Sequence, residues 1–213
     1  KIGFGDDTDL RNLKAIADNL LDNEEMMADA NQGWSVEKTI KILPKLAAFP
    51  LKWLEEPIIA TSPASAWQKI QLASPIPLAA GENIMGTENF NNAISHGQLD
   101  IIQPDICKWG GISGNLPVIK NILKSGARYC PHYLGGGIGL AASAHLLAAV
   151  GGDGLLEIDS NINPLREDLF VPKLTYGKID IGNSVGIGIS DQHYQDFLSV
   201  HSKIITMNIE LTK

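Results

Sequence analysis

The 213-residue chain is predicted to fold as an α/β protein of the (β/α)8 barrel type. Short apolar runs alternate with amphipathic helical patterns, which indicates βαβ units and a parallel sheet. Seven strand ends and six intervening helices exceed what most open sheets of this length hold. A polar or charged residue closes every apolar run at a similar spacing. These observations favour the barrel over a flavodoxin-like open sheet, which normally has fewer strands.

The predicted strands are short and mostly apolar, as expected when helices cover both faces of a sheet. The first is only the strand end at Lys1, and the chain begins there without a Met. Barrels of this type need about 250 residues, so the chain is short by about one strand–helix unit. We therefore expect it to be the interior of a longer protein. The other strands are predicted at Glu25–Asp29, Leu51–Glu55, Pro77–Glu82, Asp100–Asp105, Ala127–His132 and Gly154–Glu157.

Helices are predicted between these strands from the recurrence of apolar residues every three or four positions. After Asp159 the pattern changes to a loop-rich and then glycine-rich closing segment, followed by a terminal helix near Asp191–Lys203. The tail from Ile204 to Lys213 alternates like a strand, and its place is left open. We predict a barrel domain over residues 1–190, incomplete at its N-terminus, and a C-terminal helix and tail over residues 191–213. The inner helices are expected near Asp9–Leu21, Ser35–Phe49, Ala64–Ala73, Thr87–His96, Ser113–Ser125 and Leu140–Val150.

The composition excludes several classes of function. A net charge of −7 argues against nucleic acid as a partner, since duplex binding depends on clustered Lys and Arg. No apolar stretch approaches the roughly 20 residues that cross a bilayer. Cys107 and Cys130 make no disulfide framework, and reduced thiols are the simpler interpretation. We expect a cytoplasmic protein that acts on neither nucleic acid nor membranes.

The polar residues that end the predicted strands recur at nearly regular intervals along the chain. Their spacings are 28, 26, 27, 23, 27 and 25 residues. In a barrel, this spacing places all seven side chains around the rim where active sites lie. The alternative is that Asp and Glu cap helices after each strand, which would explain one or two of them. The seven residues are Lys1, Asp29, Glu55, Glu82, Asp105, His132 and Glu157.

Three carboxylates from consecutive strands predict a metal site. Asp29, Glu55 and Glu82 would repel one another and take up protons unless a cation joined them. Oxygen ligands without Cys or His suit Mg²⁺, with Mn²⁺ as an alternative. The other possibility is a set of salt bridges without metal, but only Lys1 is near enough to pair with them. Metal binding is therefore the favoured interpretation.

Asp105 and His132 end neighbouring strands and are predicted to form a carboxylate–imidazole pair. Such a contact fixes the tautomer of the imidazole and makes it a competent acid or base. Lys1 lies on the other side of the carboxylates in strand order, where low-dielectric surroundings can turn a lysine into a base. Asn31 and Lys108 are candidates to touch substrate or to order the metal ligands.

Five motifs in order resemble the enolase superfamily. Metal-ligand motifs of that superfamily are similar to the runs Asp29–Trp34, Trp53–Pro57 and Gly81–Asn83, with Glu55 as the ligand and Glu56 as its neighbour. The run Gln103–Gly111 resembles its sixth-strand motif. Asp105 stands where other branches carry a catalytic lysine, so Asp105 with His132 resembles the dyad of the mandelate racemase branch of the mandelate racemase/muconate lactonizing enzyme family. Leu155-Leu156-Glu157 matches the eighth-strand glutamate of that branch.

This resemblance implies a (β/α)7β barrel whose first strand and N-terminal capping domain lie outside the chain. It also implies Mg²⁺-dependent removal of the α-proton of a carboxylate substrate through an enediolate. Lys1 and His132 would flank the α-carbon, Asp105 would orient His132, and Glu157 would donate to the substrate carboxylate. We expect an acid-sugar dehydratase that forms a homo-oligomer. The alternatives are a racemase or epimerase of a 2-hydroxy acid, or a catalytically incomplete fragment.

Two rival interpretations remain from other classes. A Schiff-base lyase barrel would need a lysine deep on an inner strand and no group of three carboxylates. A barrel that binds ligands without catalysis is the rival outside enzymology.

Overall fold

The computed structural model describes residues 1–170 and 172–210, with side chains described for residues 1–170 and 172–201. It contains two compact units. The first comprises residues 1–132 and 152–155, and the second comprises residues 133–151 and 156–213. The predicted domain boundary after residue 190 stays a prediction.

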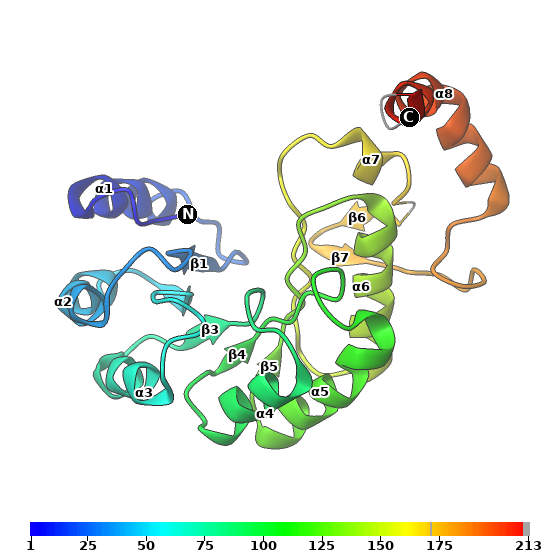
Figure 1. The fold of residues 1–213 in the computed structure, drawn as a ribbon. Coiled ribbons are helices and arrows are strands. Elements are labelled where there is room, and N and C mark those ends of the chain that lie inside the picture. The colour runs from blue at the N-terminus through cyan, green and yellow to red at the C-terminus, as the bar shows by residue number, and fades with distance from the viewer. Residues whose placement is uncertain (171, 211–213) are drawn as a thin grey trace. The chain divides into compact units, whose positions relative to one another are not determined.

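The first unit is built on a parallel sheet whose five strands lie in sequence order (Figure 1). This order differs from a flavodoxin-like sheet, in which the second strand lies at an edge beside the first. The α/β class is therefore confirmed and the open-sheet alternative is not. Within residues 1–170 and 172–210, each strand from β1 to β5 pairs with the next one, and no pairing joins β5 back to β1. Closure of the sheet into a barrel therefore stays a prediction. The strands are β1 (Met26–Asp29), β2 (Leu51–Glu55), β3 (Leu78–Ala80), β4 (Ile101–Ile102) and β5 (Arg128–Tyr129).

One side of this sheet forms an inner layer with a contribution from each strand segment. Met27 of β1 packs against a buried cluster drawn from the other four segments. Layers of this kind fill the interior of barrels and support the residues at the strand ends. The cluster consists of Trp53, Ala79, Ile101 and Cys130.

Several strands end earlier than the sequence pattern predicts. The ladders of β4 and β5 end at Ile102 and Tyr129, before the predicted site residues, and a proline, which has no backbone N–H, follows two residues later in each segment. The prediction of a strand at Gly154–Glu157 is wrong, because Leu155 donates its N–H to Cys130 Sγ at 3.4 Å instead of to a strand carbonyl. Lys1 also lies outside regular strand, although the next residue donates to Asp29 O at 2.8 Å.

The helices of the first unit lie close to their predicted positions. The carboxylate of Asp9 accepts from the N–H groups of Gly3 and Phe4, so the first helix starts three residues before the predicted position. Ser35 caps the next helix by accepting from Lys38 N at 3.2 Å. The helices are α1 (Asp6–Ala17), α2 (Val36–Leu46), α3 (Ala64–Ala73), α4 (Thr87–Ser95) and α5 (Gly111–Ser125).

The second unit holds three helices and a hairpin among its described residues. Gly139 allows α6 to pack against an aromatic ring, because a Cβ there would lie 2.5 Å from Tyr133 Cε2. The final helix continues through residue 210, so the strand-like alternation of residues 204–210 does not form a strand. Residues 211–213 of that tail lie outside the described residues. The elements are α6 (Gly137–Val150), α7 (Pro164–Glu167), β6 (Leu174–Thr175), β7 (Lys178–Ile179) and α8 (Asp191–Glu210).

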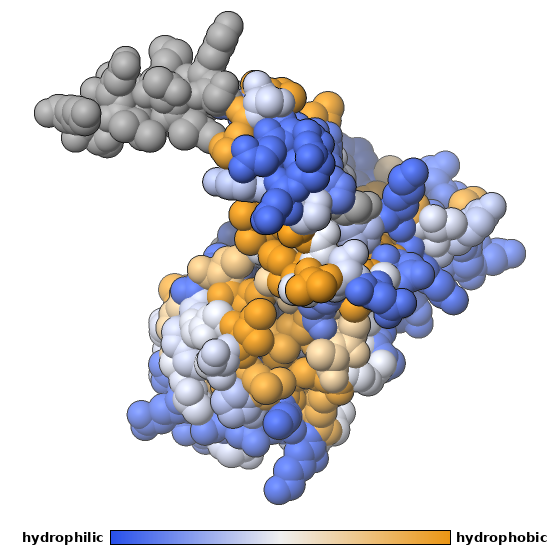
Figure 2. Space-filling model, turned by 90° about the vertical axis from the view of Figure 1, so that its right-hand side faces the viewer, coloured by the Kyte–Doolittle hydropathy of each residue, from blue (hydrophilic) through white to orange (hydrophobic). Residues whose placement is uncertain are grey.

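Apolar side chains also reach the surface of the second unit. Leu134, Ile138 and Leu165 are each about half exposed. Figure 2 shows apolar residues gathered on the face of the molecule that it presents. Across the described part of the chain, no helix combines the length and apolar character needed to cross a membrane.

Candidate active site

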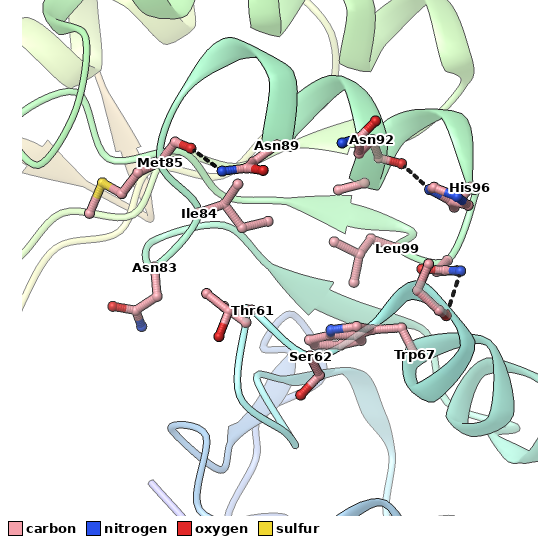
Figure 3. Close-up of a pocket in the computed structure, with 14 residues that line it drawn as sticks. Thr61, Ser62, Trp67, Asn83, Ile84, Met85, Asn89, Asn92, His96 and Leu99 are labelled. Atoms are coloured by element: carbon pink, nitrogen blue, oxygen red, sulfur yellow. Dashed lines mark hydrogen bonds between the residues drawn. The ribbon is translucent and has the colours of Figure 1, made fainter.

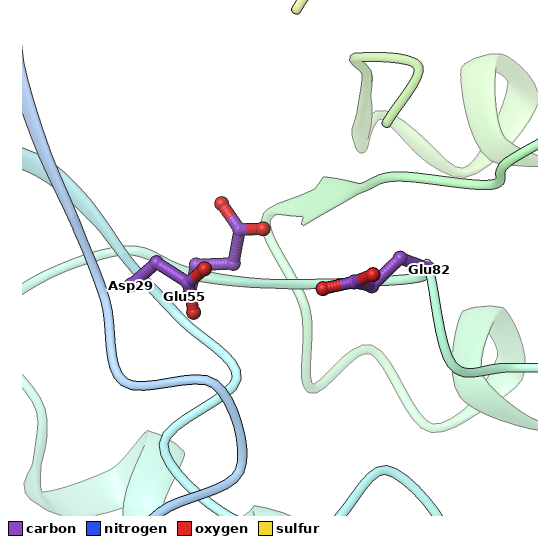
Figure 4. A group of neighbouring side chains, drawn as sticks. All are labelled: Asp29, Glu55 and Glu82. Carbon is purple, nitrogen blue, oxygen red and sulfur yellow. The ribbon is translucent and has the colours of Figure 1, made fainter. Parts of the chain in front are cut away.

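Three carboxylates from consecutive strands meet at the carboxyl end of the sheet. Asp29 and Glu55 are the last residues of β1 and β2 and pair in register, and Glu82 follows the end of β3 by two residues. One oxygen from each lies within 4.8 Å of the others. Figure 4 shows the Glu82 side chain pointing toward Asp29 and Glu55. The predicted convergence is therefore present.

Close approach of two strands sets the position of Glu82. The preceding residue is Gly81, and a Cβ at that position would lie 2.6 Å from the carbonyl oxygen of Gln103. Only glycine lets the chain after β3 pass so near the chain after β4. Glu82 is consequently held deep in the rim, with 6% of its surface exposed.

Cationic side chains surround the carboxylates. Lys1 Nζ forms an ion pair with Asp29, and Lys108 Nζ forms one with Glu82. Burial tends to lower the pKa of Lys1, but the hydrogen bond to Asp29 and the charges of Glu55 and Glu82 outweigh it and raise that pKa. Such strong attraction for positive charge is the electrostatic condition for binding a divalent cation. A donor set made only of carboxylate oxygens fits Mg²⁺.

Glu55 is oriented by two polar side chains. Trp53 Nε1 donates to Glu55 Oε2 at 3.3 Å, and Gln103 Nε2 donates to the same oxygen at 2.9 Å. Trp53 lies two residues before Glu55 on β2, so both side chains face the same side of the sheet. The sequence analysis named Trp53 and Gln103 only as the first residues of two motifs and predicted no role in the site for either side chain. The period of two along a strand could have identified Trp53.

The predicted carboxylate–imidazole pair also forms. His132 Nδ1 lies 2.8 Å from Asp105 Oδ2, and His132 Nε2 lies 3.0 Å from Glu82 Oε2. His132 is only 2% exposed, so its contacts are with protein groups and not with solvent. His132 therefore connects the buried carboxylate of Asp105 to the group of three.

Hydrogen bonds keep Asp105 in its charged form. Burial alone would raise the pKa of Asp105, but donation from His132 and from the N–H groups of Cys107 and Lys108 outweighs burial and lowers that pKa. A charged Asp105 fixes the orientation of the His132 ring. The pair therefore has the geometry of a general acid or base with its orienting group.

Three predicted site residues remain: Lys108, Asn31 and Glu157. Lys108 contacts Glu82, which fits the predicted role of ordering a ligand. The backbone N–H of Asn31 donates to Asp29 Oδ1 at 2.6 Å, and Asn31 itself adopts a left-handed φ of 45°. Glu157 belongs to the second unit, where its Oε2 accepts from the N–H of Tyr133 at 3.0 Å. Its predicted part in substrate binding stays a prediction.

Sequence reasoning treated Glu56 only as the neighbour of a ligand, yet this residue is fully buried. Its φ of 40° places it in the left-handed region, where residues other than glycine are strained. Glu56 Oε2 accepts from Asn83 Nδ2 at 2.8 Å. Burial, together with the charges of nearby carboxylates, raises the pKa of Glu56 to about 7, while the bond from Asn83 opposes this rise. A charged residue in a buried strand-end motif was the signal that could have singled it out.

A separate cavity of about 450 Å³ lies between α3 and α4 (Figure 3). Among the described residues, those predicted for the active site do not line it. Its lining is rich in uncharged amides, with Trp67 and Leu99 as apolar members. Asn83 lines this cavity and also bonds to Glu56, so it is a wall between the cavity and the ligand segments.

Residues 1–193 match the model of the family described as enolase C-terminal domain-like. The chain is 32% identical over 199 residues to D-galactarolactone cycloisomerase of Agrobacterium fabrum strain C58, a match covering 89% of this chain and 52% of that protein. The chain spans about half the length of the curated relatives it matches.

Solved structures give the same picture. A mandelate racemase/muconate lactonizing enzyme from Bordetella bronchiseptica RB50 superposes with a TM-score of 0.84 and 46% identity, over 89% of this chain and 53% of that one. L-talarate/galactarate dehydratase from Salmonella typhimurium LT2, liganded with Mg and L-lyxarohydroxamate, has a TM-score of 0.78 and 29% identity, over 92% of this chain and 49% of that one.

Proposed function

Because the chain belongs to the enolase C-terminal domain-like family, we propose that it carries the catalytic residues of a Mg²⁺-dependent enzyme that removes the α-proton of a carboxylate substrate. The resemblance to the enolase superfamily and its mandelate racemase/muconate lactonizing enzyme family is confirmed, and so is the α/β fold class. The single observation that carries the proposal is the group of three carboxylates within 4.8 Å beside a buried carboxylate–imidazole pair. A Schiff-base lyase does not need that combination.

In this proposal Asp29, Glu55 and Glu82 hold Mg²⁺, and their oxygen atoms also suit Mn²⁺. When bound, the metal would supply positive charge that stabilises the substrate carboxylate as it becomes an enediolate. Gln103 and Trp53 hold the Glu55 carboxylate in place, and Lys108 does the same for Glu82. The relative from Salmonella with bound Mg supports this assignment.

Two groups are placed to move protons. His132 is oriented by Asp105 and carries or accepts the proton at Nε2. Lys1 contacts Asp29 and His132 contacts Glu82, so the two basic groups bracket the carboxylates. Bases on opposite sides of a substrate allow either of two outcomes. Removal by one and delivery by the other inverts a centre, whereas removal by one and protonation of a β-hydroxyl by the other dehydrates the substrate.

Acid-sugar dehydration is the outcome that we favour. Two relatives, named L-talarate/galactarate dehydratase and D-galactarolactone cycloisomerase, support a sugar acid as the small-molecule substrate. Racemisation or epimerisation of a 2-hydroxy acid is the second candidate, since the same pair of bases serves both. Donation by Glu157 to the substrate, homo-oligomeric assembly and a cytoplasmic location remain part of the proposal. The exposed apolar residues of the second unit support assembly.

Exchange of the substrate α-proton with solvent tests the proposed function. The full-length protein would be incubated in D₂O with a panel of sugar acids, with Mg²⁺ and with chelator, and followed by NMR. We expect deuterium at the α-carbon of at least one acid in the presence of Mg²⁺ and none with chelator. Absence of exchange over a broad panel would contradict an enzymatic role. If a longer form of the protein exchanges the α-proton and residues 1–213 alone do not, this chain is a catalytically incomplete fragment.

A further inference from the structure

Glu56 belongs to one of the three chain segments that carry the proposed metal ligands, and it is hydrogen-bonded to the other two. Its backbone N–H donates to Ala79 O in β3 at 2.9 Å. Its carbonyl accepts from the N–H of Gln32, in the loop after β1, at 2.7 Å. Its side chain accepts from Asn83, in the loop after β3, at 2.8 Å. Displacement of Glu56 would therefore shift the backbone next to each of the three proposed ligands.

The side-chain bond to Asn83 has a particular position in this network. Glu56 directly follows Glu55, and Asn83 directly follows Glu82. The hydrogen bond therefore joins two ligand-bearing segments with only one peptide unit between each ligand and the bond. Glu56 is also fully buried, so water is poorly placed to replace its partner. Its left-handed backbone can persist only because the surrounding contacts hold it there.

We propose that Glu56 and Asn83 form a positioning clamp that sets the separation of the Glu55 and Glu82 carboxylates for metal binding. This inference rests on the proposed function of the site. Mg²⁺ demands nearly ideal octahedral geometry, so a small shift of one ligand weakens its binding. Neither clamp residue needs to touch the metal or the substrate, because both act through the ligands that precede them.

Metal affinity of clamp variants tests this proposal. We expect Asn83→Ala and Glu56→Leu each to weaken Mn²⁺ and Mg²⁺ binding by about 10–100-fold in calorimetry. Glu56→Gln keeps an acceptor oxygen and should bind metal within about threefold of the natural protein. The double variant Glu56→Leu/Asn83→Ala should bind no more weakly than the weaker single variant, because both changes remove the same bond.

The electron paramagnetic resonance spectrum of bound Mn²⁺ reports ligand geometry directly. The spectrum should change in Asn83→Ala and should match that of the natural protein in Glu56→Gln. Asn89→Ala is the matched control, since Asn89 Nδ2 donates to Met85 O at 2.8 Å but links no ligand segments. That variant should leave both the affinity and the spectrum unchanged. Asn83 is only partly buried, so its replacement decides the outcome even if Glu56→Leu does not fold.

Two results would overturn the clamp in different ways. If the natural full-length protein binds neither metal, the proposed function fails and the clamp fails with it. If the natural protein binds metal and Asn83→Ala binds it equally well, with the same Mn²⁺ spectrum, the clamp is wrong and the proposed function stands. A lower melting temperature with unchanged metal affinity would likewise reduce the bond to a purely structural role.

Discussion

At the ends of β1, β2 and β3, three carboxylates gather within 4.8 Å, whereas beyond β4 and β5 a single carboxylate meets a single imidazole. The first region carries an excess of negative charge and attracts the cations Lys1 and Lys108. The second is balanced within itself, because Asp105 accepts from His132 and from two backbone N–H groups. The two regions therefore differ in charge balance: the three carboxylates attract further cations, whereas the Asp105–His132 pair does not require one.

This difference separates two properties of the site. In the proposed function the carboxylate region binds Mg²⁺, so its geometry should respond to metal and to substitution of Asp29, Glu55 or Glu82. The Asp105–His132 region is organised by the chain alone and should keep its shape without metal. Substitutions can therefore disable one region while leaving the other almost intact.

The largest expected effect follows loss of the imidazole. His132→Asn should lower the rate of α-proton exchange by about 10²–10⁴-fold, because it removes the proposed general acid or base. Mg²⁺ affinity should change by less than about tenfold, since His132 approaches only one ligand. Deuterium exchange and calorimetry on the same preparation measure the two effects. If affinity falls as far as the rate, the two regions are not separable.

A smaller effect is expected on metal binding when one ligand loses its charge. Glu82→Gln should weaken Mg²⁺ affinity by at least about 100-fold, because loss of a direct ligand should cost no less than loss of a group that only orients one. The size of the side chain is preserved, so stability should be largely retained. Glu88→Gln, an exposed change in the first turn of α4, is the control and should bind Mg²⁺ normally. Unchanged Mg²⁺ affinity in Glu82→Gln would remove Glu82 from the ligand set.

The smallest expected effect concerns stability and pH. The pKa of Asp105 is lowered in the folded protein, so its charge stabilises the fold above its ordinary pKa of 3.8, and this contribution disappears as the pH falls through the lowered value. Asp105→Asn should lower the free energy of unfolding by roughly 1.5–3 kcal/mol at pH 7, the range for hydrogen bonds to charged groups. Urea unfolding should show this difference shrinking below about pH 4. A difference that stays constant down to pH 3 would contradict the assignment.

Much of the rim could be predicted from sequence because its residues share one phase. Asp29, Glu55 and Glu82 follow apolar strands, and parallel strands bring their carboxyl ends to one edge. The contact between Asp105 and His132 followed from the same argument. Positions relative to neighbouring strands were thus enough to find both regions.

The parts that escaped prediction depend on details that a pattern of apolar residues does not contain. The strands β4 and β5 end before Pro104 and Pro131, whereas the pattern of apolar residues predicted longer strands. The N–H of Leu155 donates to the sulfur of Cys130, and the spacing of apolar residues gives no sign of such a bond. Glu56 was predicted only as the neighbour of a ligand, and its burial and the bond from Asn83 are known from the structure alone.

Gly81 has a consequence for protein engineering. Anyone transplanting this arrangement of acids onto another parallel sheet would have to move the glycine with the glutamate that follows it. An alanine there would press on the main chain at Gln103, the residue that holds Glu55, so a single added methyl group would disturb two acids at once. A design that copies only the charged residues would contain the same carboxylates but would not hold them at the same separations.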